Sequence, residues 1–105
     1  MDSKLQERLR DISQRLKNEY HAEKVILFGS YAREENTKDS DVDILVIAPT
    51  KEQFFQRMAT VRRLVRDLRY GLPLSPIVMT KEEVDERKEK GDHFVLEIVR
   101  NGVSL

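Results

Sequence analysis

Two aspartates separated by one residue, Asp41 and Asp43, are the first candidates for chemistry in this chain. They lead into an aliphatic run at residues 44–47 that is typical of a buried strand. Because side chains alternate between the two faces of a strand, both carboxylates project from one face and can hold one cation. Mg²⁺ is the usual cation where phosphate oxygens supply further ligands. The alternative is an acidic pair left in solvent, and the neighbouring Asp39 and Ser40 are compatible with it.

A glycine and a serine, Gly29 and Ser30, follow the preceding apolar run. Glycine lets the backbone approach a ligand closely, and free N–H groups beside a serine hydroxyl suit a phosphate. Because strand-Gly-Ser turns are common, an ordinary turn is the alternative. Arg33, in a short helix predicted at residues 31–35, has a guanidinium that matches phosphate oxygens. A surface ion pair with a neighbouring glutamate is its alternative role.

Hydrophobic periodicity predicts the elements that position these residues. Helices are expected at residues 3–19, 31–35, 54–70, 81–90 and 92–100, and strands at residues 24–28, 42–48 and 74–79. Capping boxes are expected at Ser3 with Gln6, Thr50 with Gln53, and Thr80 with Glu83. This alternation indicates an α/β (α+β) fold, with a small mixed sheet of three strands, or four, flanked by helices. We expect a single domain spanning residues 1–105.

The composition excludes several classes of protein. The 105 residues contain no cysteine, which rules out disulfides, thiolate nucleophiles and cysteine-based zinc sites. The 19 basic and 19 acidic side chains cancel, so no bulk attraction to nucleic acid or to an anionic membrane is expected. Apolar runs are far shorter than the roughly 20 residues that cross a bilayer, and the N-terminus does not resemble a signal peptide. We therefore expect a cytoplasmic protein.

The spacing of the two motifs resembles the signature of the DNA polymerase β-like nucleotidyltransferase superfamily. A Gly-Ser pair, ten residues and an Asp-x-Asp motif run from the end of one predicted strand to the start of the next. The chain is most similar to the smallest branch, the minimal nucleotidyltransferase (MNT) domain family. Members of that family often read Gly-Ser-Tyr-Ala-Arg and then Ser-Asp-x-Asp, as residues 29–33 and 40–43 do here.

This resemblance implies a palm-like nucleotidyltransferase core and an Mg²⁺-dependent transfer of a nucleoside monophosphate, AMP from ATP by expectation, to a hydroxyl of a partner protein. Asp41 and Asp43 would be the catalytic residues and would hold the metal, whereas Gly29, Ser30 and Arg33 would bind the nucleotide. An in-line displacement at phosphorus needs charge neutralisation and positioning, which agrees with these roles. The family also implies an antitoxin in a toxin–antitoxin system, paired with a helical HEPN-domain protein. A homodimer stays open, and nucleic acid is not the expected partner.

The sequence departs from the family pattern in one respect. Active members usually carry a third carboxylate on the next strand, which completes the metal cage and helps to deprotonate the acceptor. Its expected position here is Ser75, or Pro76, and residues 69–81 contain no Asp or Glu. Asp67 and Glu83 belong to flanking helices, and nothing in the sequence places either at the site. The alternative function is therefore a weakened or inactive nucleotidyltransferase-fold module that acts by protein–protein contact.

A basic stripe on the longest predicted helix supports a third interpretation. Arg62, Arg66 and Arg69 recur at helical spacing. A nucleic-acid surface would use such a stripe, with binding that weakens steeply as salt rises. A solvated face opposite the apolar side of this helix is the alternative.

Overall fold

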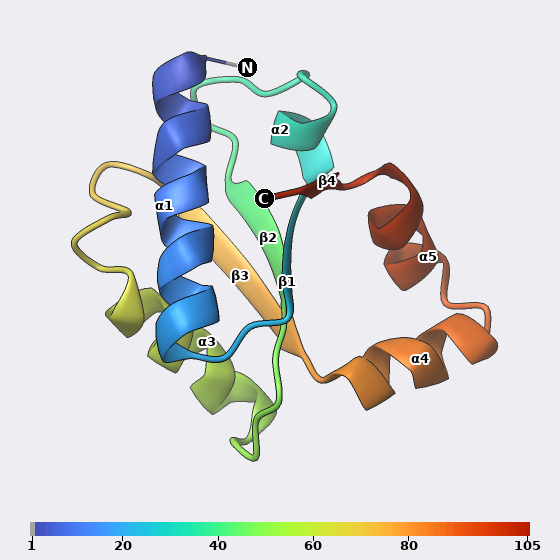
Figure 1. Cartoon of the computed structure of the whole chain (residues 1–105). Coiled ribbons are helices and arrows are strands. Elements are labelled where there is room, and N and C mark those ends of the chain that lie inside the picture. Colours follow the sequence, from blue (N-terminus) through green and yellow to red (C-terminus); the bar gives the residue numbers. More distant parts are fainter. Residues whose placement is uncertain (1) are drawn as a thin grey trace.

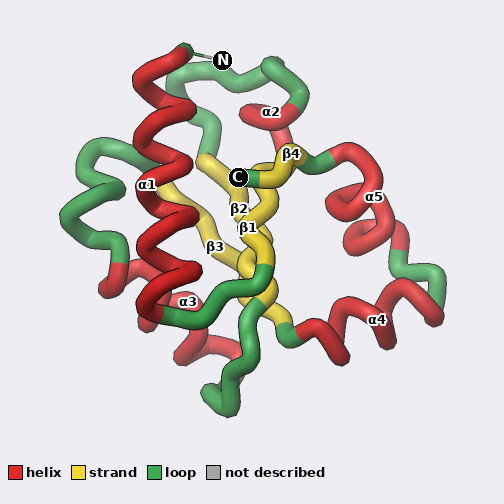
Figure 2. Tube along the Cα trace, viewed as in Figure 1, coloured by secondary structure: helices red, strands yellow, loops and turns green. Residues whose placement is uncertain are grey.

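Helices and short strands alternate along the chain in the computed structural model, which describes residues 2–105 (Figures 1 and 2). The helices are α1 (Ser3–Glu19), α2 (Gly29–Ala32), α3 (Phe54–Leu64), α4 (Lys81–Glu89) and α5 (His93–Asn101). The strands are β1 (Lys24–Phe28), β2 (Val42–Ile47), β3 (Leu74–Met79) and β4 (Val103–Ser104). The predicted α/β fold class is confirmed. The short helix begins earlier than predicted, since α2 starts at Gly29.

The strands form one mixed sheet in the order β3-β2-β1-β4. Strand β1 is antiparallel to β2 and to β4, whereas β2 and β3 are parallel. A parallel pair needs a crossover connection, and α3 supplies it between β2 and β3. The two-residue β4 follows α5 and is the fourth strand that the sequence left open.

The sheet separates two hydrophobic clusters, with α1 and α3 on one face and α4 and α5 on the other (Figure 2). Strand β2 contributes to both clusters because its side chains alternate. Val42, Ile44 and Val46 face α1 and α3, whereas Leu45 and Ile47 face α4 and α5. Asp43 therefore lies on the α4–α5 face, one step along the strand from Leu45. Within residues 2–105, no helix has the length and apolar character to span a bilayer.

Helices α3 and α4 begin at capping boxes. The box at Thr80 is confirmed, since its side chain accepts from the N–H of Glu83 and the Glu83 carboxylate accepts from the N–H of Thr80. The box predicted at Thr50 lies later in the chain, because Gln53 caps α3 with Gln56 as its reciprocal partner. Thr50 instead accepts from a backbone N–H in the preceding turn.

Helix α3 ends at Leu64, earlier than the hydrophobic pattern predicted. Arg15 of α1 donates to the Leu64 carbonyl and pairs with Asp67, and Arg8 donates to the Leu68 carbonyl. In a continuing helix the Leu64 carbonyl would accept from an N–H four residues later. Long-range arginine contacts therefore satisfy the carbonyls at which α3 unwinds.

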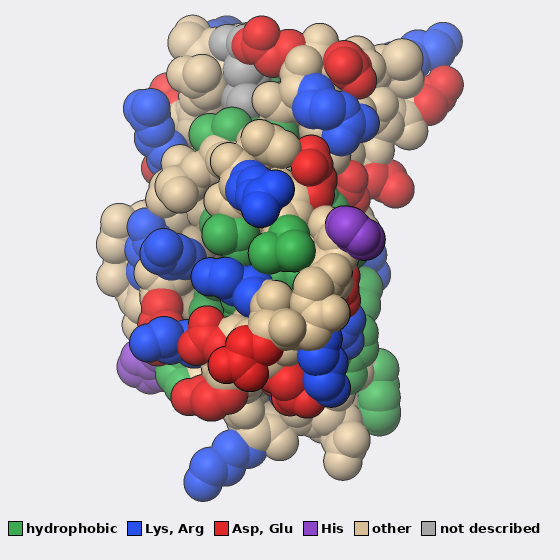
Figure 3. Space-filling view, turned by 90° about the vertical axis from the view of Figure 1, so that its right-hand side faces the viewer, with side chains coloured by type: hydrophobic (Ala, Val, Ile, Leu, Met, Phe, Trp, Pro, Cys, Tyr) green, Lys and Arg blue, Asp and Glu red, His purple; other side chains and the backbone are tan. Residues whose placement is uncertain are grey.

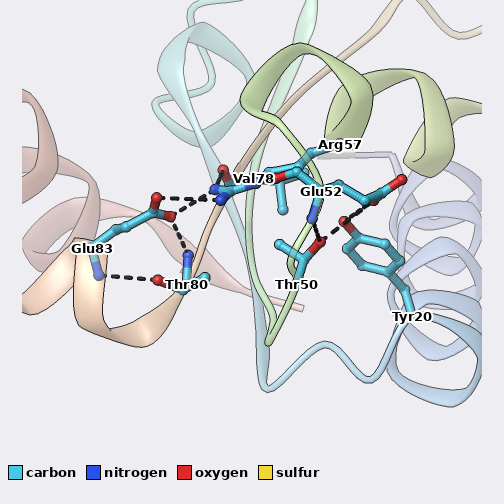
Figure 4. Close-up of polar contacts among 7 residues, drawn as sticks. All are labelled: Tyr20, Thr50, Glu52, Arg57, Val78, Thr80 and Glu83. Carbon is cyan, nitrogen blue, oxygen red and sulfur yellow. Dashed lines mark hydrogen bonds and ion pairs between the residues drawn. The ribbon is translucent and has the colours of Figure 1, made fainter.

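A buried arginine ties α3, β3 and α4 together (Figure 4). Arg57 is 8% exposed and donates to the carbonyls of Glu52 and Val78, at 3.0 and 3.2 Å. It also makes a two-pronged contact with Glu83, whose Oε1 lies 2.6 Å from Nη1. Hydrogen bonding to Arg57 lowers the pKa of the Glu83 carboxyl below its ordinary value. The same carboxylate caps α4 at Thr80, so one ion pair fixes where α4 leaves the sheet.

A residue with left-handed backbone geometry follows α1. Asp2, rather than Ser3, caps the start of this helix, and Tyr20 closes its end. The next residue, His21, is exposed and has φ +58°, a region that favours glycine. We expect His21→Gly to raise the free energy of unfolding by about 1 kcal/mol in a denaturant titration. His21→Ala keeps the unfavourable geometry and is the control; an equal gain from both variants would contradict the explanation.

Candidate active site

Three residues on neighbouring strands lie in one row across the sheet. Asp43 of β2 lies opposite Phe28 of β1 and opposite Ser75 of β3 in the strand registers. Side chains opposite each other on neighbouring strands share a face, so all three point toward the α4–α5 side. Asp41, two residues before Asp43, belongs to the same face by the alternation of a strand and is exposed. The row thus has an aromatic side chain at one end and a serine at the other, with a carboxylate between them.

The electrostatics of the carboxylate pair favour a bound cation. Burial raises the pKa of the Asp43 carboxyl above its ordinary value, and the nearby Asp41 carboxylate raises it further. The ionised form of Asp43 is thus disfavoured by its surroundings in the absence of a positive charge. Two carboxylates are a suitable donor set for a hard cation such as Mg²⁺, which keeps its remaining positions for water and phosphate oxygens. The pair could therefore hold such an ion.

Gly29 brings the end of β1 against the Asp43 carboxylate. It has φ +74°, and a Cβ built on it would lie 2.5 Å from Oδ2 of Asp43. Any other residue would meet both the left-handed backbone and this carboxylate. Ser30 follows directly, is half-buried, and its hydroxyl makes no hydrogen bond to the rest of residues 2–105. The structure thus places Gly29 against the Asp43 carboxylate, with Ser30 next in the chain.

We expect Gly29→Ala to cost about 1–3 kcal/mol of unfolding free energy, because the added methyl adds a clash to the backbone strain. Gly71→Ala is the matched control, since Gly71 has φ +76° but no atom within 4 Å of its would-be Cβ. The Gly71 variant carries the backbone penalty alone and should cost about 1 kcal/mol. The excess at Gly29 should vanish in an Asp43→Ala background. Equal costs at both glycines would show that the carboxylate does not crowd Gly29.

Arg33 lies beside the site but is engaged at the surface. Its Nε donates to the Glu35 carboxylate at 3.1 Å, and about half of its side chain is exposed. The surface ion pair considered from the sequence is therefore present. Arg33 also lines the cavity next to Gly29. Its guanidinium could therefore release the Glu35 carboxylate and bind a phosphate while staying near the Gly29–Ser30 turn.

Neither Asp67, which lies in the turn after α3, nor Glu83 of α4 replaces the missing carboxylate. Asp67 pairs with Arg15, and Glu83 pairs with the buried Arg57. Ser75 occupies the register position beside Asp43, where a third carboxylate would share its face. Across residues 2–105 there is no group of three or more His, Asp or Glu side chains placed to hold a metal ion. The candidate metal site therefore consists of two carboxylates.

A cavity of about 410 Å³ lies between α2 and α5, next to this site. Phe28 and Gly29 form its sheet side, and Phe94 of α5 packs against Phe28 with ring centroids 5.6 Å apart at 90°. Sequence reasoning missed this cavity, because no local pattern shows that α5 faces α2. The helical spacing of Phe94, Glu97 and Asn101 is a signal that these residues share a face, but it does not show which element that face meets.

Comparisons with known proteins agree with this arrangement. The family model for the nucleotidyltransferase domain matches residues 9–102. A protein of Methanocaldococcus jannaschii named "putative protein adenylyltransferase" is 36% identical over 73 residues, which is 69% of this chain and 72% of the relative. A second protein with that name from the same organism is 34% identical over 82 residues, 78% of this chain and 80% of the relative.

A solved structure has the same fold. The crystal structure of a "putative nucleotidyltransferase" from Sulfolobus solfataricus superposes with a TM-score of 0.54 at 21% identity, over 99% of this chain and 86% of that one. The strand order, the Gly-Ser turn against Asp43, the family match and the adenylyltransferase relatives lead to one conclusion. This chain belongs to the nucleotidyltransferase domain family and is a nucleotidyltransferase.

Proposed function

We propose that this protein transfers AMP from ATP to a hydroxyl of a partner protein, with Mg²⁺ held by Asp41 and Asp43. The observation that carries the proposal is the Asp43 carboxylate, whose pKa is raised by burial and by Asp41 and which lies against the turn at Gly29. Keeping the half-buried Asp43 carboxylate ionised beside Asp41 is unfavourable unless a cation binds there. The names of the M. jannaschii relatives support AMP as the transferred group and a protein as the acceptor.

The binding roles follow from the positions of the neighbouring side chains. The Gly29 backbone and the free Ser30 hydroxyl would hold the triphosphate, and Arg33 would add a guanidinium contact in place of Glu35. A bound Mg²⁺ would neutralise charge on the phosphates. These residues would mainly position the α-phosphorus and shield its charge, as phosphoryl chemistry requires.

The proton of the acceptor is the weak point of this site. In the transfer, the acceptor oxygen bonds to the α-phosphorus, the bond to the bridging oxygen breaks, and pyrophosphate leaves. The hydroxyl proton must pass to a base, and the neutral Ser75 cannot take it as a carboxylate would. We therefore expect slow transfer, with solvent or an acceptor side chain taking the proton.

A non-catalytic module is the second candidate, and Ser75 is the observation that favours it. With two carboxylates instead of three, the site would bind a second cation less tightly. A fold that kept nucleotide binding without transfer would act through contact with its partner. Exposed aromatic side chains support such contact, since Phe55 is 72% exposed and Tyr70 is 86% exposed.

The proposed partner is a helical HEPN-type protein, with this chain as the cytoplasmic antitoxin of the pair. The resemblance to minimal nucleotidyltransferases is the basis for this part of the proposal. The partner would then supply much of the acceptor-binding surface.

The experiment is transfer of label from α-³²P-ATP, with Mg²⁺, into protein in a lysate of the source organism. Label on one band that disappears with Asp41→Asn/Asp43→Asn would support the transferase, and the mass of the band would identify the acceptor. Asp39→Asn, an exposed carboxylate in the same loop, is the matched control and should leave labelling unchanged. No label from any variant would contradict the proposal.

We expect Ser75→Asp to increase labelling about tenfold or more, because it restores a carboxylate beside Asp43. Ser75→Asn has nearly the same shape without the charge and should not increase it. Label from Ser75→Asp but none from the native chain would favour the non-catalytic module. Equal labelling from the native chain, Ser75→Asp and Ser75→Asn would show that position 75 does not limit the reaction.

A further inference from the structure

The cavity between α2 and α5 has the size and lining of a small-molecule subsite. Its volume, about 410 Å³, lies at the low end of the range for ligand pockets. A cavity of this size suits a nucleoside-sized group better than a whole nucleoside triphosphate. Phe28, Phe94 and Ile98 supply apolar walls. Phe94 is 48% exposed, because its edge-on contact with Phe28 fixes the ring without covering it. A flat ligand in the cavity could therefore stack on the Phe94 ring, whose position the contact with Phe28 fixes.

Polar side chains of α5 line the same cavity without partners. Glu97 and Asn101 follow Phe94 at helical spacing, and His93 precedes it. In the part of the chain that the structure describes, none of these three polar side chains makes a hydrogen bond or an ion pair. Figure 3 views this side of the molecule, where apolar side chains reach the surface among charged ones. The three polar groups are therefore available to a ligand.

The cavity adjoins the carboxylate site directly. Phe28 lines the cavity and lies directly opposite Asp43 on the neighbouring strand. Neighbouring strands lie about 5 Å apart, so the cavity and Asp43 are one strand spacing from each other. Gly29 also lines the cavity while its Cα faces the Asp43 carboxylate. A molecule whose one end lies on Phe94 can thus place its other end at Asp43 by crossing Gly29.

From this arrangement we propose that the cavity is the nucleobase subsite of the enzyme, with Phe94 stacking on the base and Glu97 and Asn101 contacting its edge. This inference rests on the proposed function, because it takes the α-phosphate of a nucleotide to lie at Asp43. An ionised carboxylate only accepts hydrogen bonds. A carboxylate that faces the 6-position of the purine accepts from the amino group of adenine and is repelled by the carbonyl that hypoxanthine has there, so Glu97 in that place favours adenine.

The first test measures binding by calorimetry in the presence of Mg²⁺, with ATP and with inorganic tripolyphosphate as the ligand that lacks base and sugar. Phe94→Leu keeps an apolar side chain against Phe28 but removes the aromatic face. We expect it to weaken ATP binding about tenfold and to leave tripolyphosphate binding unchanged. Phe55→Leu is the matched control, an exposed phenylalanine on α3 outside the cavity, and should change neither. Thermal unfolding verifies that both variants are folded.

The second test concerns base selection at Glu97. The native chain should bind ATP more tightly than ITP, and Glu97→Gln should reduce that preference about fivefold or more, since the amide also donates. If ATP binds and transfer occurs but Phe94→Leu and Glu97→Gln change nothing, the subsite is wrong and the proposed function stands. If ATP binds with these effects but no label is transferred, the subsite stands and the transferase proposal fails. Equal affinity for ATP and tripolyphosphate, or no binding of ATP, overturns the subsite.

Discussion

Replacing Asp43 with asparagine is expected to reduce nucleotidyl transfer about a thousandfold or more and, at the same time, to stabilise the metal-free protein. Under the proposed function, the activity falls because one of the two carboxylates proposed to hold the cation is lost, and charge stabilisation at the reacting phosphate is a leading contribution to catalysis. The stability rises because the Asp43 carboxylate is held, half-buried, beside Asp41. A neutral amide of the same shape removes the cost of burying the charge and the repulsion from Asp41, which should stabilise the protein by about 0.5–2 kcal/mol.

Both effects are measured on the same preparations, by label transfer and by thermal unfolding in EDTA. Asp43 has a raised pKa in the folded state, so its unfavourable contribution is absent at low pH, begins as the pH rises through the unfolded pKa and is complete above the folded one. The gain from Asp43→Asn should therefore be larger at pH 7 than at pH 3. Asp39→Asn should show neither effect. A variant that is inactive and also less stable at pH 7 would mean that Asp43 supports the fold rather than the reaction.

Replacing Arg57 with alanine is expected to destabilise the protein by about 2–4 kcal/mol, the largest stability effect we predict for one side chain. The substitution removes a buried guanidinium that binds the Glu52 and Val78 carbonyls and pairs with Glu83. Those carbonyls would be left without their donor, and α4 would lose its link to the sheet. For a domain of this size, the melting temperature should fall by about 10–25 °C.

Glu83→Gln provides the matched control, because glutamine can still close the capping box at Thr80 but cannot form the ion pair. It should cost about 1 kcal/mol, less than Arg57→Ala, because much of the Glu83 side chain is exposed (41%). The pKa of Glu83 is lowered in the folded state. Its stabilising contribution is therefore present above the unfolded pKa and is lost as the pH falls through the folded one.

The cost of Arg57→Ala should accordingly be smaller at pH 3 than at pH 7, as measured by denaturant titration at the two values. A cost independent of pH would show that packing and the two carbonyl contacts, rather than the ion pair, account for the role of Arg57.

Short-range features of this protein were determined by the sequence alone. The aliphatic runs predict β1, β2 and β3, and the spacing from Gly29 to Asp43 predicts the family, which the comparisons confirm. The lack of a carboxylate in residues 69–81 is equally independent of any structure. These features could be predicted because alternation, capping and motif spacing depend on neighbouring residues, whose geometry the backbone limits to a few conformations.

Features that depend on contacts between distant residues were decided only by the tertiary structure. The parallel register places Ser75 beside Asp43. Asp67 and Glu83 form ion pairs with arginines and therefore do not join Asp43 as a third carboxylate. The early end of α3 depends on arginines of α1.

The cavity also depends on contacts between distant residues, because α5 packs on the sheet in a position where it faces α2. Such pairings are set by how apolar faces bury each other and by which buried polar groups find partners. Neither is encoded in the spacing of residues along the chain.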